Sequence, residues 1–178
     1  MSVNKIILGI DPGSRVAGFG ALCLGPDRSI RLLTYGVIAP PRGLEFNHRI
    51  AIVSEEMEAL LARLKPDVTV VEKVFFGKNA DSAFKLGQAR GATIAAIVRA
   101  QSSIVEYATR AVKKGITGIG SATKEQVQQV LFSHFSLPTE SASLDASDAL
   151  ALAYHHAKQL EIQKRIPDKR GGAKELEL

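Results

Sequence analysis

The first 72 residues alternate between short apolar runs and one longer stretch with helical spacing. Runs rich in β-branched and other apolar residues, at 4–11, 16–24 and 30–38, are separated by Pro- and Gly-containing turns, and predict three antiparallel strands in a meander. From 44 to 64 the apolar residues recur three or four positions apart, which predicts a helix that ends at Lys65-Pro66. Residues 68–71 are entirely apolar and predict a short buried strand that stops at Glu72.

The second half of the chain is mainly helical by pattern. Residues 79–82 can cap a helix that runs to about 101, and a strand follows at 103–107. We then expect a short helix at 109–114, a glycine-rich loop at 115–120, a helix capped by Ser121 or Thr123 that runs to about 135, and a last helix from about 143–145 through 160. The glycine-rich loop lacks the Gly-Lys-Ser/Thr ending of a P-loop, so we do not interpret it as a phosphate site.

Length and composition predict one domain. The chain has 178 residues, of which 46% are hydrophobic, enough for one buried core. We assign residues 1–160 to this domain and expect the charged segment 161–178 to be disordered. The single cysteine, Cys23, excludes a disulfide framework or a thiol metal cluster within the chain. We see no signal peptide and no apolar run long enough to span a bilayer, so we expect a cytoplasmic protein with no membrane partner.

Four acids lie at the ends of predicted strands or at the start of a predicted helix, where they could bind a metal ion. Asp11 and Glu72 each end a predicted buried strand, although an aspartate before a turn is about as often a turn-former as a ligand. Asp145 and Asp148 are three residues apart at the start of the last helix and therefore share one face. The helix dipole explains one of these two acids well and the pair poorly. A divalent cation would remove their repulsion, and carboxylate oxygens suit Mg²⁺ or Mn²⁺. Together the four acids are typical of two-metal phosphoryl transfer.

Basic residues gather in two short segments. The formal net charge is +5, and 73–90 and 109–128 each carry four Lys or Arg against one Asp or Glu. A solvated basic surface is the simplest explanation, but the interleaved phenylalanines of the first segment favour a nucleic-acid groove, where cations neutralise phosphates and rings stack on bases. The candidate DNA-binding residues are Phe75, Phe76, Lys78, Arg90, Lys113, Lys114 and Lys124.

Small residues recur every four positions along the helix predicted at 79–101. This stripe consists of Ala83, Gly87, Gly91 and Ala95, and it predicts a close approach by another element. The neighbour is either the chain's own sheet or the same helix in a second copy, and the spacing alone does not choose between them. For the four histidines we expect ordinary structural roles, because no other ligands converge on them in sequence.

Seven short motifs, taken in this order, resemble the RuvC family of Holliday junction resolvases. They are GIDPGSR at 9–15, EKVF at 72–75, KNADSA at 78–83, LGQARG at 86–91, VK at 112–113, GIGSATK at 118–124 and DASDALA at 145–151. The resemblance covers about residues 4–157. Lys73 and Phe76 depart from the glutamine and methionine common in this family, which bears on the sequence preferred at the nick.

The resemblance implies an α/β protein with the ribonuclease H-like fold, a mixed five-stranded sheet with helices on both faces. It implies a homodimeric endonuclease that cuts four-way DNA junctions in recombination and repair by paired symmetric nicks, leaving 5′-phosphate and 3′-hydroxyl ends. Two Mg²⁺ ions, replaceable by Mn²⁺, would be the cofactor, and RuvA and RuvB the partners in branch migration.

The same resemblance assigns roles to residues. It makes Asp11, Glu72, Asp145 and Asp148 catalytic metal ligands. Phe75 would stack at the opened crossover, Lys113 and Lys124 would contact the DNA backbone, and the helix at 81–101 would pair with its dimer mate. Two alternatives stay open: a junction-binding protein without catalysis, and an ATPase of the actin-like superfamily, which would need two such domains.

Overall fold

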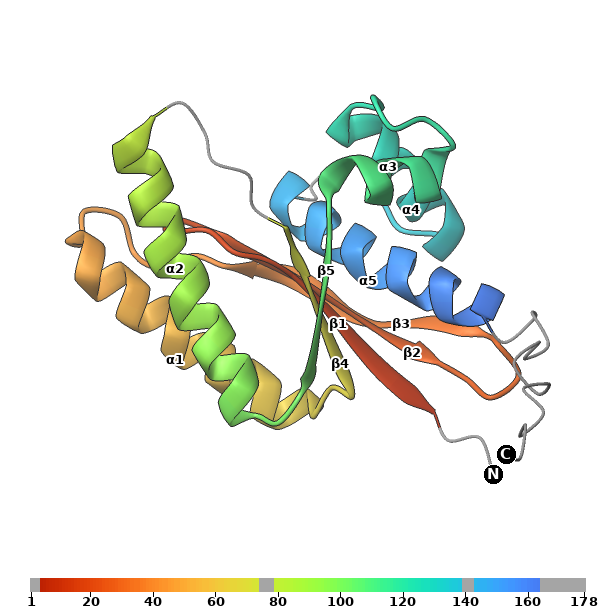
Figure 1. Ribbon diagram of the computed structural model, residues 1–178, viewed down its shortest axis with the longest axis horizontal. Helices are drawn as coiled ribbons and strands as arrows, with labels where there is room; N and C mark the ends of the chain where they lie inside the picture. Colours follow the sequence, from red (N-terminus) through yellow and green to blue (C-terminus); the bar gives the residue numbers. More distant parts are fainter. Residues whose placement is uncertain (1–3, 74–78, 139–142, 164–178) are drawn as a thin grey trace, which may run out of the picture.

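A computed structural model describes residues 4–73, 79–138 and 143–163. This part of the chain forms five strands and five helices (Figure 1). In chain order they are β1 (Lys5–Asp11), β2 (Ala17–Leu24), β3 (Ile30–Ile38), α1 (Phe46–Leu64), β4 (Val68–Glu72), α2 (Ala80–Arg99), β5 (Ser103–Tyr107), α3 (Thr109–Thr117), α4 (Lys124–Phe135) and α5 (Leu144–Gln163).

The strands form one mixed sheet in the order β3-β2-β1-β4-β5. The meander β1-β2-β3 is antiparallel, whereas β4 and β5 lie parallel to β1 on its other side. All strands except β2 therefore run the same way. Their last residues, Asp11, Ile38, Glu72 and Tyr107, meet at one edge of the sheet, here called the carboxyl edge. The mixed five-stranded sheet is confirmed, and ligand sites in such sheets commonly lie at this edge.

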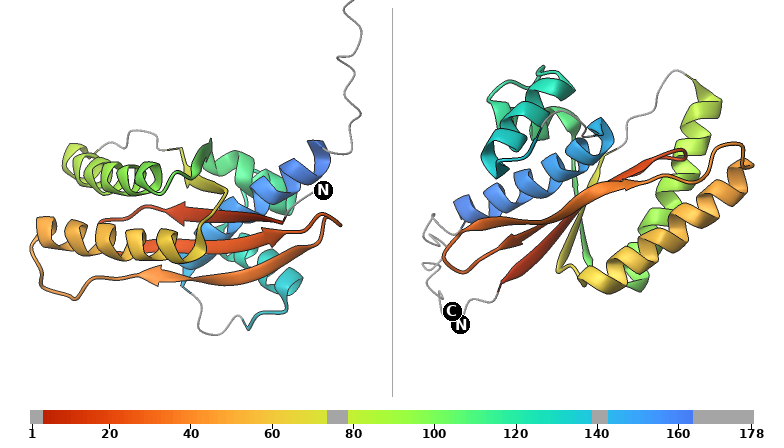
Figure 2. Two further views of the ribbon diagram at one scale, coloured as in Figure 1. Left: turned by 90° about the horizontal axis from the view of Figure 1, so that it is seen from below. Right: turned by 180° about the vertical axis from the view of Figure 1, so that it is seen from behind.

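Helices cover both faces of the sheet, as predicted (Figure 2). Because successive side chains in a strand point to opposite faces, Ile7 packs with α5 and α4, while Leu8 and Ile10 pack with α1 and α2. The same alternation places Asp11 on the α5 face. In β4, Val70 belongs to the α5 core and Val71 to the other, so Glu72 also falls on the α5 face.

Helix α5 lies unusually close to the first two strands because glycines face it. A Cβ atom added to Gly9 would lie 1.9 Å from the carbonyl oxygen of Ala149, and one added to Gly18 would lie 2.0 Å from that of Asp145. A Cβ atom on Gly20 would lie 2.6 Å from the Cα of Leu150. Distances this short exclude any larger residue without a shift of the helix. The glycines thereby hold the first turn of α5 against the end of β1.

The loop and tail boundaries differ from those expected from sequence. Helix α3 continues to Thr117, so residues 115–117 are helical and the prediction of a loop from 115 is wrong. Gly115 is required there because a Cβ atom would lie 2.2 Å from Nδ1 of His155. Helix α5 runs to Gln163, three residues past the predicted end of the domain, and the rest of the predicted tail lies outside the described residues. Among the described helices, none is both long and apolar enough to cross a membrane.

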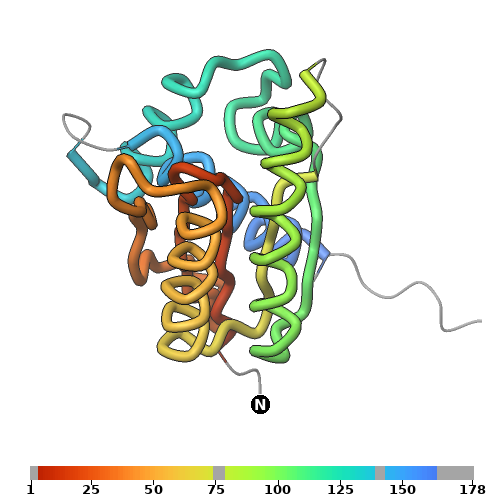
Figure 3. Tube along the Cα trace, turned by 90° about the vertical axis from the view of Figure 1, so that its left-hand side faces the viewer, coloured from red at the N-terminus to blue at the C-terminus, as the bar shows by residue number. Residues whose placement is uncertain are grey.

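The small-residue stripe of α2 points away from the sheet. The side chains that α2 buries are Ala89, Thr93, Ala96 and Ile97. Gly87 and Gly91 are exposed, and a Cβ atom on either would meet nothing within 4 Å. Of the two interpretations of the stripe, packing on the chain's own sheet is therefore wrong. Figure 3 shows α2 and α1 side by side on the same face of the sheet.

The histidines lie away from the acids. His155 and His156 are buried in α5 against Tyr107 of β5, whose hydroxyl lies 2.9 Å from Nδ1 of His156. His48 and His134 are exposed on helices. Burial lowers the pKa of both His155 and His156, which suits neutral rings packed in a core.

Candidate active site

Asp11 lies at the centre of the carboxyl edge. It is the last residue of β1, between β2, where it is paired with Gly18, and β4. Burial raises the pKa of its carboxyl group to about 7, with the negative charges of Glu72, Asp148 and Asp145 adding to the effect and Lys124 opposing it. A carboxyl group in this state carries strong repulsion from its neighbours, which a cation would relieve.

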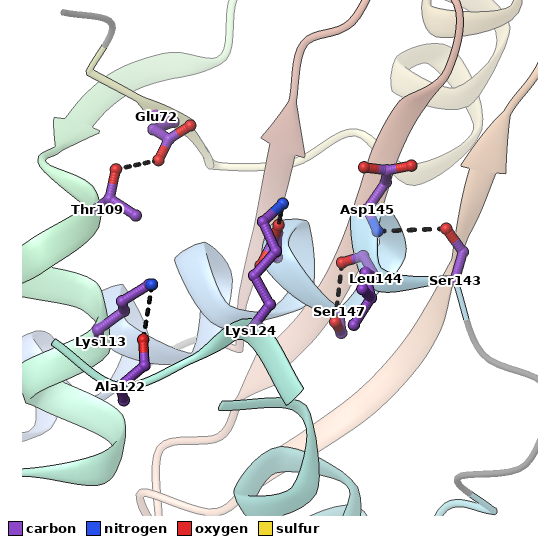
Figure 4. Close-up of polar contacts among 10 residues, drawn as sticks. Glu72, Thr109, Lys113, Ala122, Lys124, Ser143, Leu144, Asp145 and Ser147 are labelled. Carbon is purple, nitrogen blue, oxygen red and sulfur yellow. Dashed lines mark hydrogen bonds and ion pairs between the residues drawn. The ribbon is translucent and has the colours of Figure 1, made fainter. Parts of the chain in front are cut away.

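Glu72 is held by a hydrogen-bond donor that was not among the site residues predicted from the sequence. Thr109 begins α3, two residues after the end of β5, and its Oγ1 donates a hydrogen bond to Oε1 of Glu72 (Figure 4). The parallel pairing of β4 with β5 places Glu72 opposite Tyr107, so the start of α3 must lie beside the end of β4. Only this strand pairing, and no motif, could have indicated Thr109.

The first two turns of α5 carry the other two acids. Ser143 Oγ accepts a hydrogen bond of 3.2 Å from the backbone N of Asp145, and Ser147 Oγ donates one of 2.8 Å to the carbonyl oxygen of Leu144. Figure 4 shows these contacts below the carboxylate of Asp145. They fix the helix start next to the end of β1. Asp148 follows three residues later, on the same face as Asp145.

Lys124, the first residue of α4, forms an ion pair with Asp148. The hydrogen bond to Asp148 raises the pKa of Lys124, and Asp11 and Asp145 contribute to the same effect. Burial nevertheless raises the pKa of Asp148, against the influence of this lysine. The ammonium group of Lys124 therefore offsets part of the negative charge of the clustered acids. Thr123 holds α4 in place through a capping box with Gln126.

These residues surround a cleft of about 120 Å³. Its polar wall consists of Asp11, Glu72, Thr109, Lys113, Lys124 and Asp148, and its apolar wall of Val112, Val127, Ala151 and Leu152. Three of the four predicted acids thus share one cleft. Asp145 does not line it and acts on Asp11 through its charge. Lys113 is turned to the carbonyl oxygen of Ala122, 2.7 Å from its Nζ.

The donor chemistry of this cleft fits a hard divalent cation. All candidate ligands are carboxylates, the type of oxygen donor that Mg²⁺ and Mn²⁺ prefer. In the part of the chain that the structure describes, no three Asp, Glu, His or Cys side chains stand close enough to enclose one ion. Instead, the ammonium group of Lys124 lies among the acids. The observation that favours a cation is the clustering of carboxylates around Asp11, whose pKa is raised first by burial and then by the negative charges of Glu72, Asp148 and Asp145.

The remaining candidate DNA-binding residues are spread more widely. Arg90 of α2 forms an ion pair with Glu106 of β5, and Lys114 is exposed on α3; neither lines the cleft. Phe75, Phe76 and Lys78 lie outside the described residues. Of the seven candidates, the structure brings Lys113 and Lys124 to the acids.

Comparison with known proteins shows which family this chain resembles. The model of a protein family described as crossover junction endodeoxyribonuclease RuvC matches residues 7–156. A protein of that name from Bdellovibrio bacteriovorus is 44% identical over 159 residues, which cover 89% of this chain and 94% of the relative. Another from Aliivibrio fischeri is 40% identical over 170 residues, 96% of each chain.

Solved structures agree with the sequence relatives. The structure of T. thermophilus RuvC in complex with a Holliday junction substrate matches with a TM-score of 0.80 and 28% identity, covering 89% of this chain and 96% of that one. The yeast mitochondrial Holliday junction resolvase Ydc2 shares the fold, with a TM-score of 0.67 at 12% identity, and covers 89% of this chain and 80% of its own.

Proposed function

The chain belongs to the RuvC family of crossover junction endodeoxyribonucleases, and on that premise we propose that it resolves four-way DNA junctions by paired symmetric nicks. One observation carries the proposal: Asp11, Glu72 and Asp148 converge with Lys113 and Lys124 in a single cleft. The family is one of metal-dependent nucleases. The match of residues 7–156 to this family speaks against the alternative of an actin-like ATPase.

We propose Mg²⁺ as the cofactor, held by Asp11, Glu72, Asp148 and Asp145, with Mn²⁺ as a substitute. When bound, two such ions would activate a water and stabilise the charge that develops on the leaving oxygen. The expected products are a 5′-phosphate and a 3′-hydroxyl. Asp11 is the central ligand in this proposal because burial and the three other carboxylates act on it together.

The other polar groups of the cleft prepare these acids. The hydroxyl group of Thr109 donates a hydrogen bond to Glu72 and thereby fixes which carboxylate oxygen faces the cleft. Lys124 neutralises Asp148 while no substrate is bound. An incoming phosphate would compete for this ammonium group and leave Asp148 free to serve as a ligand. Lys113 would neutralise a second phosphate of the same strand.

Paired nicks require two sites, and the outer face of α2 supports a homodimer. The stripe glycines are flanked by apolar side chains in solvent, with Phe84 65% and Val98 61% exposed. An apolar face with a smooth centre suits close contact between two copies of one helix. A two-fold dimer would present its two clefts to equivalent strands of a two-fold symmetric junction. Phe75 as a stacking residue, and RuvA and RuvB as partners, complete the proposal from the family resemblance.

The decisive test is cleavage of a synthetic four-way junction. The wild-type protein should nick two opposing strands symmetrically when Mg²⁺ is added, and the nicks should be sealed by a ligase. Asp11→Asn should bind the junction with unchanged affinity in chelator but lose cleavage by at least about a thousandfold, since the central ligand is lost. Cutting by this variant at the wild-type rate would refute the site assignment. Binding without cutting by the wild type would favour the non-catalytic alternative.

A further inference from the structure

Three arginines line a second hollow at the carboxyl edge, outside the two basic segments. Arg15 lies in the turn between β1 and β2, Arg42 in the loop between β3 and α1, and Arg49 in the first turn of α1. Together with Val16, Ala39, Pro40, Pro41 and Gly43 they surround a hollow of about 530 Å³. Figure 2 shows the β3-α1 loop beside the β1-β2 turn. This arginine hollow has no part in the cleft described above.

The positive charge of the arginine hollow is not balanced by the chain itself. No acid lines it, and among the described residues none of its three guanidinium groups forms an ion pair. The Nε of Arg49 is buried and has no hydrogen-bond partner there, although its guanidinium lies 5.9 Å from the ring centre of Phe46. A buried donor without an acceptor calls for an explanation, such as a bound ligand or an ordered water. Three guanidinium groups without an ion-pair partner in the described residues favour an anion as the ligand of this hollow.

The start of α1 adds to this anion preference. The N-cap residue of α1, Glu45, makes no side-chain hydrogen bond to the helix, and the first turn carries no acid, so no side chain of the cap occupies the first amide groups. Helix N-termini with free amides attract phosphate groups. The guanidinium group itself matches phosphate oxygens with two parallel hydrogen bonds. Both features select phosphate.

The arginine hollow lies on the opposite side of Asp11 from Glu72, Thr109 and Lys113. Asp11 pairs with Gly18 of β2, and Gly18 pairs with Val37 of β3. The end of β3 is therefore two strand spacings, about 10 Å, from Asp11. Glu72, Thr109 and Lys113 lie in the other direction, toward β4 and β5. A DNA strand that crosses Asp11 can then contact Lys113 on one side and arginines on the other.

We propose that the arginine hollow binds backbone phosphates of the junction arm, about three nucleotides from the nicked phosphate, on the side away from Lys113. This inference rests on the proposed function, because it assumes that the cleft at Asp11 receives the scissile phosphate. It extends the DNA-binding surface along the carboxyl edge as far as the end of β3, the outermost strand on that side. Arg15, Arg42 and Arg49 hold the arm so that the strand to be cut lies across Asp11.

The first test measures junction binding in chelator by fluorescence anisotropy. The variant Arg42→Gln/Arg49→Gln should bind roughly 10- to 100-fold more weakly at ~0.1 M salt, and its slope of log affinity against log salt should fall by about 2, since each lost phosphate contact accounts for about 0.9. The control Arg28→Gln/Arg31→Gln removes the same charge from the hairpin at the other end of β2 and β3. It should change the slope by less than about 0.5.

Two outcomes would overturn the inference: an unchanged slope in the double variant, or an equal loss in the control. Arg42 is exposed in a loop, so Arg42→Gln alone provides a variant that keeps the fold if Arg49 proves structural; it should lower the slope by about 1. The wild-type protein is assayed for Mg²⁺-dependent nicking in parallel. Failure of the wild type to bind and nick would refute the proposed function, whereas normal nicking with unaltered binding by the variants would refute only the arginine hollow.

A second test locates the phosphates. Junctions with one neutral methylphosphonate linkage, placed at successive positions from the nick, are bound to wild type and to Arg42→Gln/Arg49→Gln. Neutral linkages about three nucleotides from the nick should weaken the wild type and leave the variant unaffected. Equal weakening of both proteins at every position would contradict the proposed contact.

Discussion

Helices α5 and α2 are both 20 residues long and rich in small residues, yet they use close contact in opposite ways. Under α5 the glycines belong to the sheet, at Gly9, Gly18 and Gly20, and the helix lies on them. In α2 the glycines belong to the helix itself and face away from the sheet. Close approach within the chain brings the acids together, whereas the glycines of α2 leave open the face on which we propose the dimer contact.

The strongest way to break this comparison is to fill the space under α5. Gly9→Val places atoms where the Ala149 carbonyl oxygen lies 1.9 Å from an added Cβ atom, and should destabilise the fold by about 3 kcal/mol or more. Thermal unfolding should therefore begin roughly 6–12 °C lower. Gly43→Val tests the same change where no atom lies within 4 Å, although its φ of 86° adds strain there. A Gly9→Val protein with wild-type stability would show that the helix is not seated on this glycine.

The second prediction concerns the burial of Asp11 under α5 and the negative charges around it, which together raise its pKa. A folded-state pKa near 7 against an ordinary value of 3.8 means that the folded protein binds more protons between these two values. Stability of the metal-free protein should therefore fall as the pH rises from about 4 to 7. Asp11→Asn removes this effect, so it should be more stable than wild type by about 2–4 kcal/mol at pH 8 and equal to it below pH 4.

Urea unfolding in chelator at pH 4, 6 and 8 would measure this difference. The matched control is Asp81→Asn on α2, an exposed acid 2.6 Å from Lys85, which should change stability by less than about 1 kcal/mol. A wild type that is as stable at pH 8 as Asp11→Asn would show that the acids are not under mutual repulsion.

The smallest effect on the monomer is expected at the stripe of α2. Gly91→Ala meets no atom of its own subunit and should stabilise the helix by up to about 1 kcal/mol. Gly91→Leu should likewise leave the monomer folded but weaken a dimer built on this face by at least about tenfold, measured by sedimentation velocity. Ser133→Leu, at an exposed position of α4, adds the same side chain outside the stripe and serves as the control. Undiminished dimerisation of Gly91→Leu would move the interface elsewhere.

The sequence predicts the strands, the acids at two strand ends and most of the helix limits, because the alternation of apolar and polar residues and the capping residues are local signals. It also places Asp11 and Glu72 on strand ends correctly. What it cannot supply are contacts that depend on register. Thr109 reaches Glu72 only through the pairing of β4 with β5, and the role of Gly18 emerges only when α5 is laid on the sheet.

The wrong loop boundary has a similar origin. Residues 115–117 look like a loop by composition, yet they belong to α3, and residue 115 is a glycine because His155, forty residues later, takes the space beside it. The arginine hollow was not expected either, since its three members come from separate segments with no local excess of charge. Sequence periodicity reports only on residues close together in the chain. Which of several similar residues contacts a distant segment is decided by tertiary packing.

The contact between α5 and β1 joins the two ends of the described chain. Asp11 is synthesised before Asp148, which follows only after β2 to α4. Because contacts so distant in sequence form late, a growing polypeptide has the first acid of the cleft without its partners. The proposed nuclease centre can therefore be assembled only after α5 has been synthesised.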